Sequence, residues 1–146
     1  MEFRQITQDK ERYMELLLLA DEQESMIYRY LAQGDMYVLF APEAVGVCVV
    51  LDLGDGIFEI KNLAIATPWQ KKGYGRAMME FILQRYAGGK EMLVGTGESP
   101  LTLPFYKKCG FQEHHRVENF FIEHYDHPIF EGGVQLVDMI YLSRKL

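Results

Sequence analysis

The residues best suited to chemistry lie in one octet, Gln70-Lys71-Lys72-Gly73-Tyr74-Gly75-Arg76-Ala77. Its two glycines let the backbone curl so that successive N–H groups converge, and the positive end of a following helix adds charge at the same point. The octet carries three cations in a chain with 15 Lys and Arg against 21 Asp and Glu. Because helix N-termini normally favour acidic side chains, the octet predicts a phosphate-binding site, with a solvated basic helix start as the alternative.

The spacing of the octet does not fit two common phosphate motifs. The dinucleotide-binding pattern needs a third glycine or alanine where Met78 stands. The P-loop needs Ser or Thr after Gly-Lys, whereas Gly89-Lys90 is followed by Glu91.

Cysteine and histidine offer weaker signals. The two cysteines, Cys48 and Cys109, form no CxxC pair, so neither a disulfide framework nor a thiolate metal site is expected. Cys109 is a conceivable nucleophile, but no histidine is adjacent in sequence, and a packed helix end is the preferred interpretation. Four histidines occur late in the chain without a fixed helical spacing, and we expect structural or substrate-pocket roles rather than metal binding for them: His114, His115, His124 and His127.

The elements that position these residues are predicted to form a mixed α/β fold. Strands are expected at residues 3–6, 36–41, 45–53, 57–66, 91–96, 111–123 and 134–142. Two helices are expected within residues 9–33, one between the octet and Gly88-Gly89, and a short one from Pro100 to Lys108 with Ser99 as its N-cap. The first four strands form a meander. The fifth runs parallel to the fourth if the helix between them is a crossover.

Composition limits the class of protein. With 146 residues, 49% of them hydrophobic, and no repeat or linker, the chain is expected to form a single domain over residues 1–146. A net charge of −6 argues against nucleic acid or an anionic membrane surface as partner. The longest apolar stretch, residues 45–51, is too short to span a membrane, and no secretory leader is readable at the N-terminus, so a cytoplasmic location is predicted.

The octet, written Q-x-x-G-x-G-x-A, resembles the pyrophosphate-binding motif of the GNAT superfamily, the general N-acetyltransferases that use acetyl-coenzyme A. Glu59–Ile65 (EIKNLAI) resembles the fourth strand of that family, and Phe105–Phe111 (FYKKCGF) resembles its FYxxxGF element. The ending, from Asn119-Phe120-Phe121 to Asp138-Met139-Ile140, resembles that of small bacterial members of the YvbK type. The resemblance implies the GNAT fold, with a mostly antiparallel seven-stranded sheet, a splay between its parallel fourth and fifth strands, and about four helices.

The resemblance also implies a reaction, in which an acetyl group moves from acetyl-CoA to a primary amine by direct attack in a ternary complex, without a metal. The coenzyme-binding residues would be Leu63, Ala64, Ile65, Gln70, Lys71, Lys72, Gly73, Tyr74, Gly75, Arg76 and Tyr106. Within this set, the N–H of Leu63 would face the acetyl oxygen and that of Ile65 the pantetheine arm.

Two residues would be catalytic by the same resemblance. Glu59 would serve as general base; it lies four residues before Leu63, so strand alternation predicts the same face for both. Tyr106 would protonate the departing thiolate. The alternatives are a solvent-facing strand glutamate for Glu59 and a core aromatic for Tyr106.

Two other functions remain open at this point, namely a coenzyme A-binding regulator without turnover and a nucleotide-binding enzyme. The acceptor, a small-molecule amine or a peptide amine, is not specified. In the resembled family the early helices and the last hairpin flank the acceptor. Acidic and aromatic residues in these regions could therefore shape a pocket for a cationic amine, with ordinary surface positions as the equal alternative: Asp21, Glu22, Glu24, Tyr28, Tyr30, Tyr125 and Asp126. The resemblance also allows a homodimer, since dimers are common in that family.

Overall fold

The computed structural model describes residues 1–146, and the chain divides into two units. The first comprises Met1–Lys90 together with Leu146, and the second comprises Glu91–Lys145.

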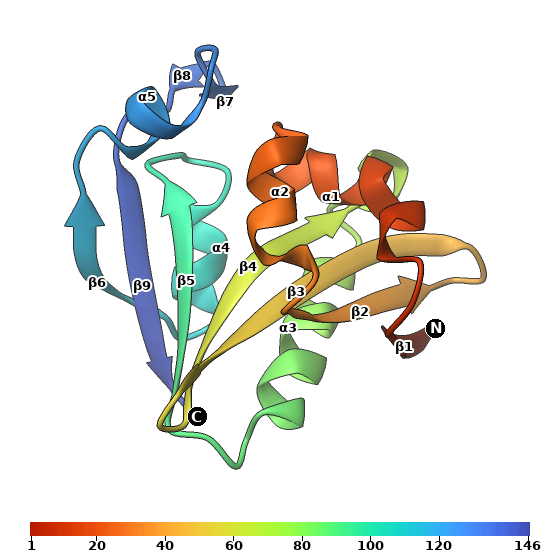
Figure 1. Ribbon diagram of the computed structural model, residues 1–146. Coiled ribbons are helices and arrows are strands. Elements are labelled where there is room, and N and C mark those ends of the chain that lie inside the picture. The colour runs from red at the N-terminus through yellow and green to blue at the C-terminus, as the bar shows by residue number, and fades with distance from the viewer. The chain divides into compact units, whose positions relative to one another are not determined.

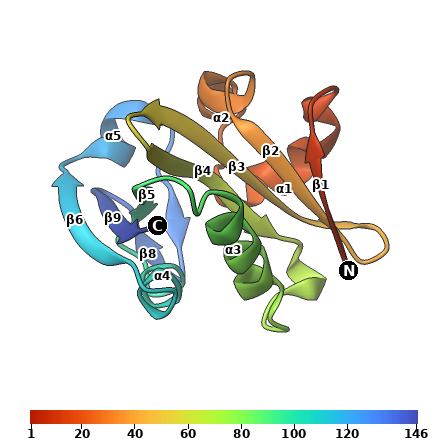
Figure 2. The same ribbon diagram turned by 90° about the horizontal axis from the view of Figure 1, so that it is seen from below.

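The first unit is an antiparallel meander of four strands in the order β1-β2-β3-β4 (Figure 1). The strands are β1 (Glu2–Ile6), β2 (Asp35–Phe40), β3 (Ala44–Gly54) and β4 (Ile57–Ile65). A 3₁₀ turn (Lys10–Tyr13) precedes α1 (Met14–Ala20) and α2 (Glu24–Leu31), and a second one (Thr67–Trp69) precedes α3 (Tyr74–Arg85). Helices α1 and α2 lie on one face of these strands and α3 lies on the other (Figures 1 and 2).

Both faces of this meander are covered, which explains its continuous apolar runs. On the face of α1 and α2, the buried cluster consists of Leu17, Ile27, Tyr30, Leu31, Met36, Val38, Val47, Val49 and Ala64. Helix α3 contributes Met78, Met79 and Ile82, all buried. Residues of β3 alternate between the two faces, so Val47 and Val49 face α1 and α2, whereas Cys48 faces α3.

A β-bulge interrupts the pairing of β3 with β4. Val49 pairs with Asn62, but the next residue, Val50, pairs with Ile60, so Lys61 is the extra residue on β4. Such a bulge shifts the alternation of side chains by one position. Nothing in the local sequence predicts this shift.

The second unit has three antiparallel strands in the order β5-β9-β6. They are β5 (Glu91–Gly97), β6 (Gln112–Val117) and β9 (Met139–Lys145). The unit also contains α4 (Leu103–Lys108), α5 (Phe120–His124) and a hairpin of β7 (Phe130–Glu131) and β8 (Val134–Gln135). Helix α5 and the hairpin share a small core of Phe121, Ile129 and Leu136.

The seven predicted strands are present, four in the first unit and three in the second, but the predicted tail was partly wrong. The strand predicted over residues 111–123 ends at Val117, because Asn119 turns the chain with φ 58° into α5. The strand predicted over residues 134–142 is divided between β8 and β9. There are thus five α-helices rather than about four.

The predicted start of α4 was also wrong. Ser99 Oγ accepts the N–H of Leu101 at 3.1 Å, and the carbonyl of Ser99 accepts the N–H of Leu103 at 3.2 Å. Ser99 therefore organises a turn through Pro100, and the helix begins at Leu103.

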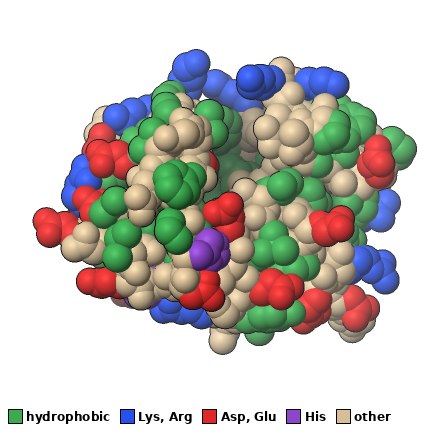
Figure 3. Space-filling model, turned by 90° about the horizontal axis from the view of Figure 1, so that it is seen from above, with side chains coloured by type: hydrophobic (Ala, Val, Ile, Leu, Met, Phe, Trp, Pro, Cys, Tyr) green, Lys and Arg blue, Asp and Glu red, His purple; other side chains and the backbone are tan.

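No helix combines the length and the apolar character needed to cross a membrane. Figure 3 shows acidic side chains distributed in small groups over the face that it draws, with basic side chains gathered mainly toward its edges.

Candidate functional site

The loop that joins β4 to α3 has the backbone that the octet predicts. We call residues Gln70–Arg76 the phosphate loop. Lys71 and Gly73 both adopt positive φ, 62° and 90°, and Gly73 is the N-cap of α3. Gln70 ties the loop to the end of β4, since its Nε2 donates to the carbonyl of Ile65 at 2.9 Å. Because the first turn of a helix has free N–H groups, Tyr74, Gly75 and Arg76 present donors at this point.

The charge around the phosphate loop favours an anion. The first turn of α3 contains no acidic residue, and Lys71, Lys72 and Arg76 are all exposed. Lys72 Nζ lies 5.7 Å from the centre of the Trp69 ring, which in turn meets the Tyr74 ring edge-on at 5.6 Å. Arg76 is only loosely held by Glu80, at 3.5 Å. The loop therefore offers backbone donors and cations to one anionic group.

Strand β4 carries the candidate base. The side chain of Glu59 is 11% exposed and pairs with Lys61, whose Nζ lies 3.1 Å from Glu59 Oε2. The Lys61 side chain is 27% exposed, and its Nζ also lies 5.8 Å from the centre of the Tyr30 ring. Glu59 is thus a largely buried carboxylate with one cationic partner, rather than a solvent-facing strand residue.

The predicted alignment of Glu59 with Leu63 was wrong. Leu63 pairs with Cys48 and faces α3, whereas Glu59 pairs with Leu51 and faces α1 and α2 with Asn62. The bulge at Lys61 inserts one residue between them, so the period of two is broken. The backbone N–H of Leu63 lies in the plane of the sheet, and its predicted role does not depend on this alternation.

Leu63, Ala64 and Ile65 end β4 immediately before the phosphate loop. Ala64 is buried in the core beneath α1 and α2, while Leu63 and Ile65 are half-buried. The first unit therefore brings together all predicted binding residues except Tyr106.

Tyr106 belongs to the second unit and is buried in α4. Its ring contacts those of Phe105 and Phe111 edge-on, with centroids 5.3 Å and 6.0 Å away. The ring is thus packed against two aromatic side chains of its own unit. Its predicted contact with the coenzyme stays a prediction.

The remaining candidates of the second unit make local contacts. His114 and His115 contact each other, at 2.7 Å between their Nδ1 atoms, and His115 stacks on Tyr141. His124 contacts the carbonyl of Phe120, and His127 contacts Asp126. No group of three or more His, Cys, Asp or Glu side chains is placed to hold a metal ion. Cys109 is 7% exposed and ends α4.

The candidate acceptor-side residues of the first unit divide into two groups. Glu22, Glu24 and Tyr28 are exposed. Tyr30 is only 5% exposed, and its hydroxyl donates to Asp21 Oδ2 at 3.2 Å. Burial, with the nearby Asp21 carboxylate as the second cause, raises the pKa of Tyr30 above its ordinary value, so the hydroxyl stays protonated.

Two polar residues of β4, Lys61 and Asn62, were missed in the sequence. Asn62 is 3% exposed, and its Nδ2 donates to the carbonyl of Leu17 and to the Tyr30 hydroxyl. A buried asparagine between strand residues was the available signal, since a buried amide requires partners.

Similarity to known proteins points to one family. Residues 32–113 match the family model described as an acetyltransferase (GNAT) domain. The chain is also 37% identical over 136 residues, 90% of this chain and 88% of the other, to the protein named uncharacterized N-acetyltransferase YvbK of Bacillus subtilis.

The chain belongs to the GNAT acetyltransferase family. A GNAT family acetyltransferase of Elizabethkingia anophelis, solved with acetyl-CoA bound, is 32% identical with a TM-score of 0.93, covering 99% of this chain and 97% of the other. A Bacillus subtilis acetyltransferase in complex with CoA is 33% identical with a TM-score of 0.90, covering 99% and 98%. The predicted mixed α/β class and GNAT fold are confirmed, and the chain is an acyltransferase of this family.

Proposed function

We propose that this GNAT protein transfers the acetyl group of acetyl-CoA to a primary amine by direct attack in a ternary complex. The observation that carries the proposal is the phosphate loop, in which Gly73 with φ 90° is the N-cap of a helix whose first turn contains Arg76 and no acidic residue, with Lys71 and Lys72 just before it. Two similar GNAT structures hold acetyl-CoA or CoA, which supports the diphosphate of that coenzyme as the anion. Lys71, Lys72 and Arg76 would neutralise it.

The reaction needs a base on the acceptor side. The amine nitrogen attacks the thioester carbonyl and must lose a proton as the carbon–nitrogen bond forms. Glu59 would accept this proton, directly or through water. Its contact with Lys61, whose Nζ lies 3.1 Å from Glu59 Oε2, supports the role by holding the carboxylate in one place on β4.

The reaction also needs an oxyanion donor and an acid. The N–H of Leu63 would stabilise the charge on the tetrahedral oxygen. Collapse of that intermediate breaks the carbon–sulfur bond, and the Tyr106 hydroxyl would give its proton to the thiolate. The packing of the Tyr106 ring against Phe105 and Phe111 supports this role, because it limits the directions in which the hydroxyl can point.

The test is release of free thiol from acetyl-CoA with a panel of amines, namely tyramine, spermidine, kanamycin and a lysine-containing peptide, with mass spectrometry of the acetylated product. We expect thiol and acetylated amine in equal amounts for at least one of them. No acetylated protein should accumulate without amine, because direct attack forms no acetyl-enzyme.

Calorimetry with acetyl-CoA and with ATP separates the alternatives. Acetyl-CoA binding without transfer to any amine would favour a regulator and contradict the proposal. ATP binding without acetyl-CoA binding would favour a nucleotide enzyme.

A further inference from the structure

A buried polar network joins the β4 bulge to the helices α1 and α2. Asn62 Nδ2 donates to the Leu17 carbonyl at 2.9 Å and to the Tyr30 hydroxyl at 3.1 Å. The Tyr30 hydroxyl then donates to Asp21 Oδ2 at 3.2 Å. We call Asn62, Tyr30, Asp21 and the Leu17 carbonyl the Asn62 network. It ties the strand to the connection between α1 and α2.

The donor directions in this network are fixed. An asparagine Nδ2 only donates, so the Tyr30 oxygen must accept from it and direct its own proton to Asp21. The raised pKa of Tyr30 keeps that proton in place. The Asp21 carboxylate is therefore held at the end of α1 in one orientation.

The same network reaches the Glu59–Lys61 pair. Lys61 and Asn62 are consecutive at the bulge, and Lys61 lies over the Tyr30 ring at 5.8 Å while its Nζ contacts Glu59. A change in the position of Tyr30 or Asn62 would thus move both the cation and the carboxylate that it holds.

The stability of the fold does not by itself explain why an asparagine, rather than an apolar residue, occupies position 62. Its Oδ1 is buried without a hydrogen-bond partner, and an unpaired buried carbonyl carries a desolvation cost. An apolar residue would avoid that cost without leaving another group unpaired. The Leu17 carbonyl would still accept the N–H of Asp21 at 3.1 Å, and the Tyr30 hydroxyl would still donate to Asp21.

We propose that Asn62 and Tyr30 are positioning residues for the acceptor side of the reaction, fixing the β4 bulge against α1 and α2 so that Glu59 and Lys61 meet the amine in one geometry. The proposal rests on the proposed function. It assigns no direct contact with the acetyl group to either residue.

The test uses Asn62→Leu and Tyr30→Phe in the full chain, with the most active amine of the panel above as acceptor. For both variants we expect KM for the amine to rise or kcat to fall about fivefold to tenfold, with KM for acetyl-CoA unchanged. The Tm of Asn62→Leu should equal or exceed that of the unmodified chain, because the unpaired carbonyl is removed.

Tyr37→Phe is the matched control. Tyr37 is a buried tyrosine of the same unit on the α3 face, and its hydroxyl lies 2.9 Å from that of Tyr86. Without the Tyr37 hydroxyl, the Tyr86 hydroxyl still donates to Asp35 Oδ2. This variant should lose a buried hydroxyl without changing KM for the amine.

Hydrogen exchange gives a readout that does not depend on activity. Tyr30→Phe should speed amide exchange in residues 14–31 and 57–65, whereas Tyr37→Phe should not do so in residues 14–31. Unchanged kinetics and unchanged exchange in both network variants would overturn the inference. If the unmodified chain acetylates no amine, the proposed function fails, and the exchange result alone decides whether the network fixes the bulge.

Discussion

Lys61 Nζ lies 3.1 Å from Glu59 Oε2, on the face of β4 that α1 and α2 cover. Glu59 and Lys61 are two residues apart, so strand alternation alone places them on one face, and the bulge at Lys61 adds Asn62 to that same face. The carboxylate is mostly buried, and a buried charge needs such a partner. The base and its counter-ion are consequently two parts of one site.

Replacing Glu59 with glutamine tests the base. We expect kcat to fall about 100-fold, because general-base catalysis typically contributes at least that much, while KM for acetyl-CoA stays unchanged. The pH–rate profile should also change, because the amine must then lose its proton without the help of the carboxylate. Glu43→Gln, at an exposed position in the connection between β2 and β3, is the control. An unaltered pH–rate profile would remove Glu59 from the mechanism.

The φ angle of Gly73 allows a test of the phosphate loop. A Cβ at Gly73 meets no atom within 4 Å, but at φ 90° it costs about 1–2 kcal/mol in backbone strain. Gly73→Ala should therefore raise KM for acetyl-CoA about tenfold. Gly88→Ala is matched, since its Cβ also meets no atom within 4 Å and its φ is not in the left-handed region. Equal kinetics for the two variants would contradict the role of the loop.

Tyr106→Phe separates proton transfer from binding. The phenyl ring keeps the packing against Phe105 and Phe111, so we expect little change in stability. Without the hydroxyl, kcat should fall by about 10²-fold. Stopped-flow measurement of thiol release reports this step. Undiminished turnover would count against Tyr106 as the acid and would leave its proposed role in binding the coenzyme open.

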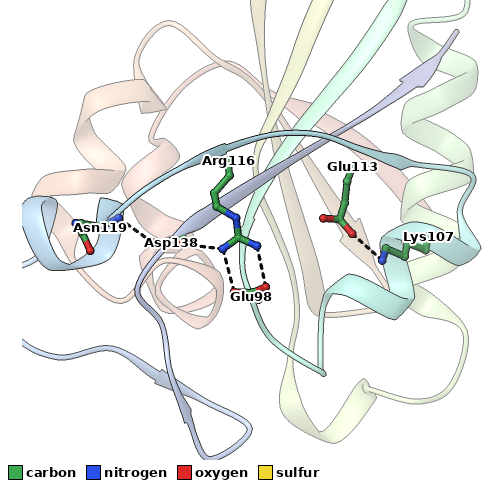
Figure 4. A network of polar contacts seen from close by, with 6 residues as sticks. All are labelled: Glu98, Lys107, Glu113, Arg116, Asn119 and Asp138. Atoms are coloured by element: carbon green, nitrogen blue, oxygen red, sulfur yellow. Dashed lines mark hydrogen bonds and ion pairs between the residues drawn. The ribbon is translucent and has the colours of Figure 1, made fainter.

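A cluster of ion pairs in the second unit allows a test of how stability depends on pH; it consists of Arg116, Glu98 and Asp138 (Figure 4). Arg116 contacts Glu98 at 2.9 Å and Asp138 at 2.6 Å, and Asp138 also accepts the N–H of Asn119. The Arg116 side chain lowers the pKa of Glu98, and the Asn119 N–H followed by Arg116 lowers the pKa of Asp138. Figure 4 also shows a separate pair, Lys107 with Glu113.

Because these pKa values are lowered in the folded state, the stabilisation is present at neutral pH and is lost as the pH falls through the folded values. Arg116→Ala should lower Tm slightly at pH 7, and this difference in Tm should be smaller at about pH 2, because the stabilisation is lost as the pH falls through the lowered pKa values of the two carboxyls. Calorimetric melts at both pH values measure this. Since the groups are exposed, high salt should also reduce the difference at pH 7. A Tm difference that is undiminished at low pH would contradict the account.

The phosphate loop and most elements of the first unit could be predicted from sequence because their signals are local. Gly73 permits positive φ, and the spacing of Met78 and Ile82 marks the buried face of α3. Pairing partners, by contrast, are not encoded in a short segment. The bulge at Lys61 depends on how β3 aligns with β4, so sequence alternation placed Glu59 and Leu63 on one face.

The secondary structure of the residues from Asn119 onward was harder to predict for a related reason. Phe120, Phe121 and Ile122 have strand propensity, yet they form α5. Asp138, 19 residues away, accepts the N–H of Asn119 where the turn begins, and Phe121 packs with Ile129 and Leu136. These contacts connect distant parts of the sequence and override local preference.

The most direct test of the central claim is a crystal structure of the chain with acetyl-CoA. We expect the diphosphate oxygens at about 3 Å from the N–H groups of Tyr74, Gly75 or Arg76, at the start of α3. A structure with the coenzyme bound elsewhere and the phosphate loop empty would contradict the account.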